Sequence, residues 1–157
     1  MIISTQCYLE SGENRLMLYR NKKQNDPNAG KWIAAGGKLE PGETVDECAV
    51  REVIEETGFK MNSFTKRAVV QFISDTFDDE EMHIYTSDDF QKICEPVSDE
   101  GQFEWIPVSE IFNLNLWEGD RLFLKYLIEA RPYFEMRLEY RGDHLVYASL
   151  DGQSINI

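Results

Sequence analysis

A capped helix that carries glutamates on its inner face is the feature that most constrains this chain. Thr44 with Glu47 forms a capping box, and Gly58 is the left-handed residue that ends many helices, so the sequence predicts a helix over residues 45–57. Its stripe at positions i, i+4, i+7 and i+11 consists of Val45, Ala49, Glu52 and Glu56. Glutamates therefore occupy positions that an amphipathic helix normally gives to leucine, and solvation alone explains this poorly.

Strand patterns lie before and after this helix. Strands are expected over residues 2–9, 15–20, 66–74, 81–87, 102–107, 134–140 and 144–150. A second amphipathic helix is expected over residues 120–130, ended by Pro132. Strands interleaved with two substantial helices predict an α/β or α+β fold with a mixed sheet and helices packed on it. The length of 157 residues favours a single domain over residues 1–157.

Charge and cysteine usage exclude several classes of protein. The net charge of −13 disfavours polymeric nucleic acid as a partner, because phosphate neutralisation supplies most of that affinity. A small nucleotide accompanied by a cation remains compatible with this charge. The three cysteines, Cys7, Cys48 and Cys94, lack any C-x-x-C pair, so we expect buried small hydrophobes rather than disulfides or a zinc site.

Targeting signals are not apparent in the sequence. The first residues have no basic region, and no stretch approaches the roughly 20 apolar residues that span a bilayer. We therefore expect no membrane partner and, by default, a cytoplasmic location.

The three glutamates of the helix predict a metal site. Glu52, Glu55 and Glu56 fall within an arc of about 100°, because positions i, i+3 and i+4 share one face of a helix. Carboxylates this close repel one another unless a positive charge lies among them. A hard divalent ion, Mg²⁺ or in its place Mn²⁺, takes such oxygen ligands. The alternative is an ordinary acidic helix face paired with basic residues elsewhere.

Residues that flank the glutamates favour the metal site. Arg51 is suited to clamp Glu43 or a neighbouring glutamate through paired hydrogen bonds. Gly37, ahead of the helix, allows a main-chain carbonyl to reach a metal without a side chain in the way.

The spacing of these residues matches a known motif. Gly37, Glu43 and the run from Arg51 to Phe59 fit G-x5-E-x7-R-E-U-x-E-E-x-G-U at every fixed position, so the chain resembles the Nudix hydrolases. This resemblance implies an α/β/α sandwich, divalent metal dependence and cleavage of a diphosphate linked to another group. It also implies that Glu52, Glu55, Glu56 and the Gly37 carbonyl are metal ligands, with Glu43 and Arg51 in support.

Three further stretches are similar to the MutT-type nucleoside triphosphatases. These are "LMLYRNKK" with "GKWIAAGGK", then "SDEGQFEW", and finally "LWEGDRLF". The resemblance implies that Glu100 is a fourth carboxylate, either a metal ligand or the base for the attacking water. An exposed turn glutamate is the alternative for Glu100.

The same resemblance suggests residues for the nucleotide. Lys38 and Lys23 are candidates for the triphosphate, against the alternative of solvated lysines. Trp117 and Asp120 are candidates for the base, through a stacking face and a carboxyl group, although Trp117 also fits a plain core position.

Two positions depart from the mammalian oxidised-purine enzymes. Ile33 stands where those enzymes read the base with asparagine, and Glu118-Gly119 stands where they have acids. The bacterial MutX-like relatives share the isoleucine. A pocket that cannot make a hydrogen bond discriminates less between analogues, so these departures weigh against selectivity for oxidised purines, whereas the shared isoleucine supports the assignment.

The leading hypothesis is a Mg²⁺-dependent hydrolase that converts a nucleoside triphosphate, such as 8-oxo-dGTP, to monophosphate and pyrophosphate, in nucleotide-pool sanitation. Alternatives are a Nudix hydrolase for ADP-ribose, a dinucleoside polyphosphate or an RNA 5′-pyrophosphate, and a module that binds a nucleotide without turnover. A monomer and a homodimer are both compatible with the sequence.

Overall fold

The structure, a computed structural model, describes residues 1–22, 25–97 and 101–157. The elements in chain order are β1 (Ile2–Ser11), β2 (Asn14–Arg20), β3 (Trp32–Ile33), α1 (Val45–Thr57), β4 (Phe59–Ser74), β5 (Glu80–Lys92), β6 (Gly101–Pro107), α2 (Val108–Ile111), α3 (Glu118–Ile128), β7 (Phe134–Arg141), β8 (His144–Leu150) and β9 (Gln153–Ser154). Within these ranges, no helix is long and apolar enough to cross a membrane.

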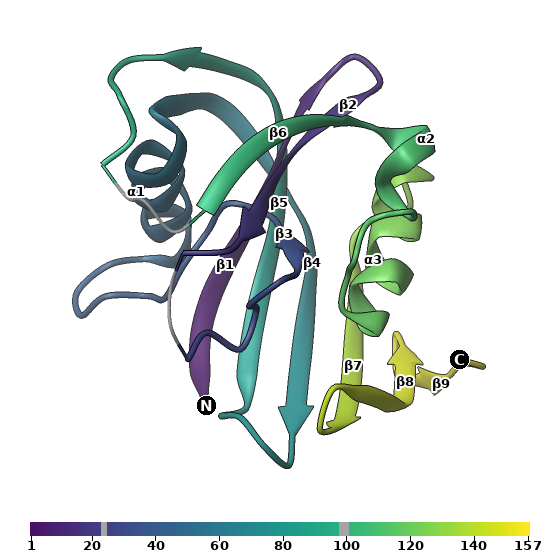
Figure 1. The fold of residues 1–157 in the computed structure, drawn as a ribbon. Helices are drawn as coiled ribbons and strands as arrows, with labels where there is room; N and C mark the ends of the chain where they lie inside the picture. Colours follow the sequence, from purple (N-terminus) through teal and green to yellow (C-terminus); the bar gives the residue numbers. More distant parts are fainter. Residues whose placement is uncertain (23–24, 98–100) are drawn as a thin grey trace.

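The strands form one mixed sheet, as predicted. Its order is β3-β2-β1-β5-β4-β7-β8-β9, and β6 pairs with β2 beside this path. The β1–β5 and β4–β7 pairs are parallel, whereas the remaining pairs are antiparallel. Figure 1 shows α1 on one side of the sheet and α2 with α3 on the other, which is the expected α/β/α arrangement.

Each face of the sheet has its own apolar core. On the α1 side, Cys7 and Leu9 of β1 belong to a cluster with Ala49 and Val53 of the helix. On the α3 side, Tyr8 belongs to a second cluster that includes Phe123. Successive residues of a strand point to opposite faces, so β1 contributes to both cores.

The ends of α1 agree with the prediction. The Thr44 side chain accepts a hydrogen bond from the Glu47 amide, the Glu47 side chain accepts one from the Thr44 amide, and Gly58 adopts a left-handed conformation with φ of 78°. The helix is therefore held in place at both ends by local contacts.

Some predicted boundaries were wrong. Strands β4 and β5 are longer than expected because they form an extended antiparallel ladder, with register shifts between Met61 and Ala68. Elements β3, α2 and β9 were not predicted, since they have only two to four residues each. Helix α3 lies two residues earlier than predicted at each end, and the left-handed Ala130, with φ of 56°, follows it before Pro132 is reached.

The prediction for the cysteines holds at two of three positions. Cys7 and Cys48 are buried free thiols, as expected of small hydrophobic residues. Cys94 is exposed, so the prediction that it is buried was wrong. It lies beyond the end of β5, outside both apolar cores, where no packing covers it.

Candidate active site

Helix α1 presents its glutamates beside the glycine loop of residues 34–41. Glu56 is only 5% exposed, and its Oε2 accepts a hydrogen bond of 3.4 Å from the Gly36 amide. The Glu52 side chain is mostly buried, whereas that of Glu55 is 45% exposed. The helix therefore turns Glu52 and Glu56 toward the loop and leaves Glu55 at the rim.

Arg51 connects this group of carboxylates. Its guanidinium donates two hydrogen bonds to Glu43, from Nε at 2.7 Å and from Nη2 at 2.9 Å. Its Nη1 donates to Glu52 at 2.7 Å and to Glu55 at 3.3 Å, and Nη2 also reaches the Lys38 carbonyl at 3.2 Å. The predicted contact between Arg51 and Glu43 is confirmed, and it ties the loop to the helix.

The clamp changes the proton affinity of both partners. Hydrogen bonds from Arg51 and from the Glu40 amide lower the pKa of Glu43 to about 2. The hydrogen bonds of Arg51 to Glu43 and Glu52 raise the pKa of Arg51 above its usual value. Both groups are therefore charged at neutral pH, which keeps the clamp closed under working conditions.

The two glycines of the loop allow very close approach of the backbone. A Cβ added at Gly36 would lie 1.9 Å from the Thr5 carbonyl oxygen, and one at Gly37 would lie 2.5 Å from the Glu52 carboxyl carbon. The Gly37 carbonyl accepts a hydrogen bond of 2.9 Å from the Thr5 amide, so β1 also holds this peptide. Only glycine fits at either position without displacing a neighbour.

The chemistry of these residues fits a hard divalent cation. Gly37, Glu52, Glu55 and Glu56 border one cavity and offer only oxygen donors, which is the preference of such ions. Within the described ranges, no three His, Cys, Asp or Glu side chains converge closely enough to hold an ion, and Arg51 contacts two of the three glutamates. The ligand roles therefore stay a prediction.

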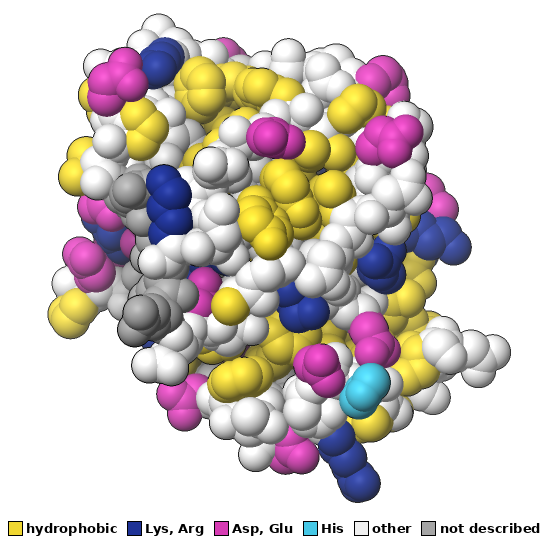
Figure 2. Space-filling model, in the orientation of Figure 1, with side chains coloured by type: hydrophobic (Ala, Val, Ile, Leu, Met, Phe, Trp, Pro, Cys, Tyr) yellow, Lys and Arg dark blue, Asp and Glu magenta, His cyan; other side chains and the backbone are white. Residues whose placement is uncertain are grey.

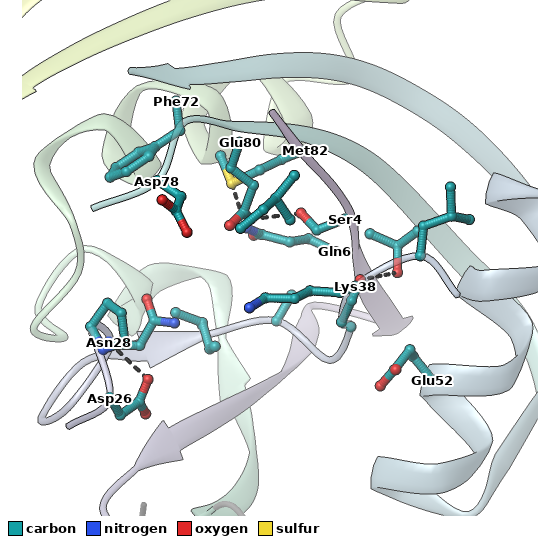
Figure 3. A pocket seen from close by; sticks show the side chains of 18 of the residues that line it. Ser4, Gln6, Asp26, Asn28, Lys38, Glu52, Phe72, Asp78, Glu80 and Met82 are labelled. Atoms are coloured by element: carbon teal, nitrogen blue, oxygen red, sulfur yellow. Dashed lines mark hydrogen bonds between the residues drawn. The ribbon is translucent and has the colours of Figure 1, made fainter. Parts of the chain in front are cut away.

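A cavity of about 820 Å³ extends from these carboxylates to the side of the sheet that α3 covers. We call the part bordered by Gly37, Glu52, Glu55 and Glu56 the carboxylate end. The opposite part, the base end, is bordered by residues from three separate segments, namely Gln6 of β1, Asn28 of the loop before β3, and Trp117 with Asp120 at the start of α3. Figure 3 shows Glu52 on α1 to one side and Asn28 in its loop on the other.

Lys38 lies between the two ends of the cavity. Figure 3 shows its side chain extending from the glycine loop across the cavity, between β1 and the segment that carries Asp26 and Asn28. This position suits contact with an anionic chain that runs from one end to the other. Two other predicted site residues, Lys23 for the triphosphate and Glu100 as a metal ligand or base for water, lie outside the described residues.

Trp117 lines the cavity and is also part of the apolar core. It is 6% exposed and packs edge-on against Phe72 and Tyr140. Its indole Nε1 donates a hydrogen bond of 2.8 Å to Asn28 Oδ1, and Lys31 Nζ lies 4.9 Å from the ring centroid. The two predictions for Trp117, a surface for the base and a core position, are therefore compatible, because the same side chain lines the cavity and packs in the core.

Asp120 is a buried acid at the base end. It is 5% exposed, and this burial raises its pKa to about 7, an effect that Lys31 opposes and Glu80 reinforces. Near neutral pH the carboxyl group is therefore present in both protonation states, as a donor and as an acceptor. A Cβ added at Gly119 would lie 2.5 Å from Leu138 Cδ1 and 2.6 Å from the Tyr140 hydroxyl oxygen, so a side chain at this position would require these two side chains to move.

Comparison with known proteins identifies the family. The family model of the NUDIX domain matches residues 3–127. The chain belongs to the Nudix family. A Nudix hydrolase of Bacillus subtilis, YvcI, is 31% identical over 88% of this chain and 92% of its own length. The oxidized purine nucleoside triphosphate hydrolase of Danio rerio is 30% identical over 71% of each chain.

Solved structures agree with this assignment at the level of the fold. The crystal structure of a MutT protein from Bacillus halodurans superimposes with a TM-score of 0.85 at 23% identity, over 98% of this chain and 99% of the other. The protein is thus a Nudix hydrolase whose relatives by sequence and fold include MutT-type enzymes. Nudix enzymes generally use divalent metal ions.

One structural feature of this Nudix hydrolase was missed from the sequence. Arg20 and Asp26 form a buried ion pair with 2.7 Å between Nε and Oδ2, and Asp26 Oδ1 accepts a hydrogen bond from the Asn28 amide. These contacts place Asn28 where it binds Trp117. The turn formers around Asp26-Pro27-Asn28 predicted only a polar loop, and an acid next to proline was the available signal.

The inner face of β1 was also missed. Ser4 and Gln6 point to the same face and line the cavity, together with Glu80 and Met82 of the parallel neighbour β5. Ser4 Oγ donates a hydrogen bond of 2.6 Å to Glu80 Oε2. Polar residues inside an otherwise apolar strand were the signal, because a buried strand normally carries none without a partner.

Proposed function

We propose that this Nudix hydrolase cleaves a nucleoside triphosphate, an oxidised purine form such as 8-oxo-dGTP, to the monophosphate and pyrophosphate with Mg²⁺. The observation that carries this proposal is the single cavity that joins the carboxylate end to a largely buried base end. A nucleoside triphosphate needs both features at once, a cation site for its phosphates and an enclosed site for its base.

The carboxylate end has the residues for phosphate chemistry. We assign Glu52, Glu55, Glu56 and the Gly37 carbonyl as metal ligands, with Glu100 as a further ligand or the base for water. A bound divalent ion polarises phosphoryl oxygens and lowers the pKa of water, which permits hydrolysis at neutral pH. Lys38 lies where it would contact the phosphate chain, and the Arg51–Glu43 clamp would keep the helix and loop in register.

The base end has the residues for a purine. Trp117 offers an aromatic surface, and Asp120 offers a carboxyl group with a pKa of about 7. The name of the relative from Danio rerio supports an oxidised purine nucleoside triphosphate as the substrate.

A substrate panel with Mg²⁺ tests the proposal. 8-oxo-dGTP, dGTP, ADP-ribose and a dinucleoside polyphosphate would be compared by kcat/KM, with pyrophosphate, phosphate and monophosphate measured as products. We expect 8-oxo-dGTP to give the highest value and to release pyrophosphate. Preference for ADP-ribose over every triphosphate would refute the proposal.

A further inference from the structure

Gln6 is a side chain in the cavity whose hydrogen bonds are incomplete. Its Oε1 is buried and has no hydrogen-bond partner among the described residues. Its Nε2 donates to Met82 Sδ at 2.9 Å, and a thioether sulfur is a weak acceptor. A buried carbonyl oxygen without a donor destabilises the folded protein, so a ligand that supplies the missing partner gains affinity.

The position of Gln6 excludes a simple core role. It lines the cavity on β1, and Figure 3 shows it beside Met82 on the wall that faces Lys38 and Asn28. Tyr8, the next residue on that face of the strand, is fully within the apolar core. Gln6 is therefore placed at the boundary between the core and the space where a ligand would lie.

The other carboxamide that lines the cavity has its oxygen already paired. Asn28 Oδ1 accepts the hydrogen bond from Trp117 Nε1. Ile33, which also lines the cavity, has no polar group to offer. Among the described residues of the cavity wall, Gln6 is thus the carboxamide whose oxygen is still unpaired.

A carboxamide distinguishes an oxidised guanine from guanine. Guanine presents two neighbouring acceptors, N7 and O6, to which a carboxamide can offer only its single donor group. Oxidation at C8 places a hydrogen on N7, so the same edge then carries one donor and one acceptor. That pattern matches the acceptor Oε1 and the donor Nε2 of a glutamine, as the N7 and amino group of adenine do.

We propose that Gln6 is a specificity-determining residue that reads the N7 and O6 edge of an oxidised purine, in place of the base-reading group that Ile33 cannot supply. The proposal takes from the proposed function only that a purine nucleotide occupies the cavity. The Gln6 carboxamide would rotate about its last side-chain bond, which has a broad torsional profile, and exchange the Met82 sulfur for the base.

Binding of monophosphates tests this role without hydrolysis. The Kd values of 8-oxo-dGMP and dGMP would be measured by calorimetry for the wild-type protein and for Gln6→Met, which keeps the length of the side chain and removes both polar atoms. We expect the wild-type preference for 8-oxo-dGMP to fall by about tenfold or more in Gln6→Met, as for loss of a paired base contact. Gln6→Glu, which lacks the donor, should also lose preference.

A control separates recognition from stability. Gln91→Met changes an exposed glutamine of β5 that pairs with β4 and does not line the cavity, and it should leave the preference unchanged. The thermal midpoint of Gln6→Met should equal or exceed that of the wild type, because the substitution removes an unpaired buried oxygen. A structural role would instead lower the midpoint and leave the preference intact.

Two results would overturn the inference, namely an equal affinity of the wild type for the two monophosphates or an unchanged preference in Gln6→Met. A preference that depends on Gln6, in a protein that does not hydrolyse 8-oxo-dGTP, would refute the proposed function and leave the inference standing.

Discussion

The carboxylate end and the base end of the cavity are built in different ways. The carboxylate end comes from one continuous stretch, the glycine loop and α1, whose contacts are mostly within about twenty residues along the chain. The base end joins β1, the segment around Asn28, and the start of α3. The geometry of a site made from one local segment is set by helix capping and short-range hydrogen bonds. The geometry of a site made from several segments depends on the packing of the whole fold.

Charge also differs between the two ends. At the carboxylate end, Arg51 and the backbone hold Glu43 ionised with a pKa of about 2. At the base end, burial holds Asp120 near a pKa of about 7. The two shifts have local causes, hydrogen bonds for Glu43 and burial for Asp120, and on the face drawn in Figure 2 acidic and basic side chains are interspersed around apolar areas. Near neutral pH, Glu43 at the carboxylate end therefore keeps a constant negative charge, whereas the charge of Asp120 at the base end changes with pH.

The largest expected effect is at the carboxylate end. Glu56→Gln should lower kcat by roughly 10³ or more, because metal stabilisation of developing charge is worth several kcal/mol. Steady-state kinetics with 8-oxo-dGTP would measure it. Glu104→Gln, at an exposed position of β6, serves as the control and should leave kcat unchanged. An unaltered rate in Glu56→Gln would contradict the assignment of the metal site.

A smaller effect is expected for the supporting residue. Glu43→Gln should lower activity by roughly 10- to 100-fold, as for loss of a group that orients a ligand. Since the folded pKa of Glu43 is about 2, below its unfolded value, its contribution to stability is complete above the unfolded value and disappears as the pH falls toward 2.

Thermal unfolding at several pH values would test that linkage. The difference in midpoint between the wild type and Glu43→Gln should be greatest near neutral pH and should shrink below about pH 4. A difference that stayed constant across this range would argue against the Arg51 clamp as its cause.

At the base end, stability should depend on pH in the opposite direction. The folded pKa of Asp120 is raised to about 7, so the folded state binds more protons than the unfolded state between about pH 4 and pH 7, and stability should decrease as the pH rises through this window. Asp120→Asn should remove this slope. The slope would be measured as the change of thermal midpoint with pH, and an identical slope in the variant would exclude Asp120 as the responsible group.

The smallest effect is expected at Asn28. Asn28→Ala removes the hydrogen bond to Trp117 Nε1, so KM should rise by about fivefold, the equivalent of one net hydrogen bond, with little change in kcat. Steady-state kinetics would separate the two parameters. Asn113→Ala removes an exposed asparagine as a control. A fall in kcat without a change in KM would contradict the assignment of chemistry to the carboxylate end and of recognition to the base end.

Sequence reasoning was accurate where interactions are local. The capping box, the left-handed Gly58 and the spacing of the glutamates predicted α1 at its observed bounds. The strand boundaries were less accurate: β4 starts at Phe59 rather than at residue 66, because pairing with β5 extends it. A strand's length depends on its partner, which a single segment does not reveal.

The sequence by itself determined the mixed fold, the helix that carries the glutamates, and the family to which the chain belongs. Only the tertiary structure decided which groups share the cavity: that Gln6 lies in the wall with an unpaired oxygen, that Asn28 holds Trp117, and that Asp120 is buried. The physical reason is the separation along the chain over which each interaction acts. Helix capping and spacing act over a few residues, whereas burial and hydrogen bonding between distant segments exist only once the sheet has brought those segments together.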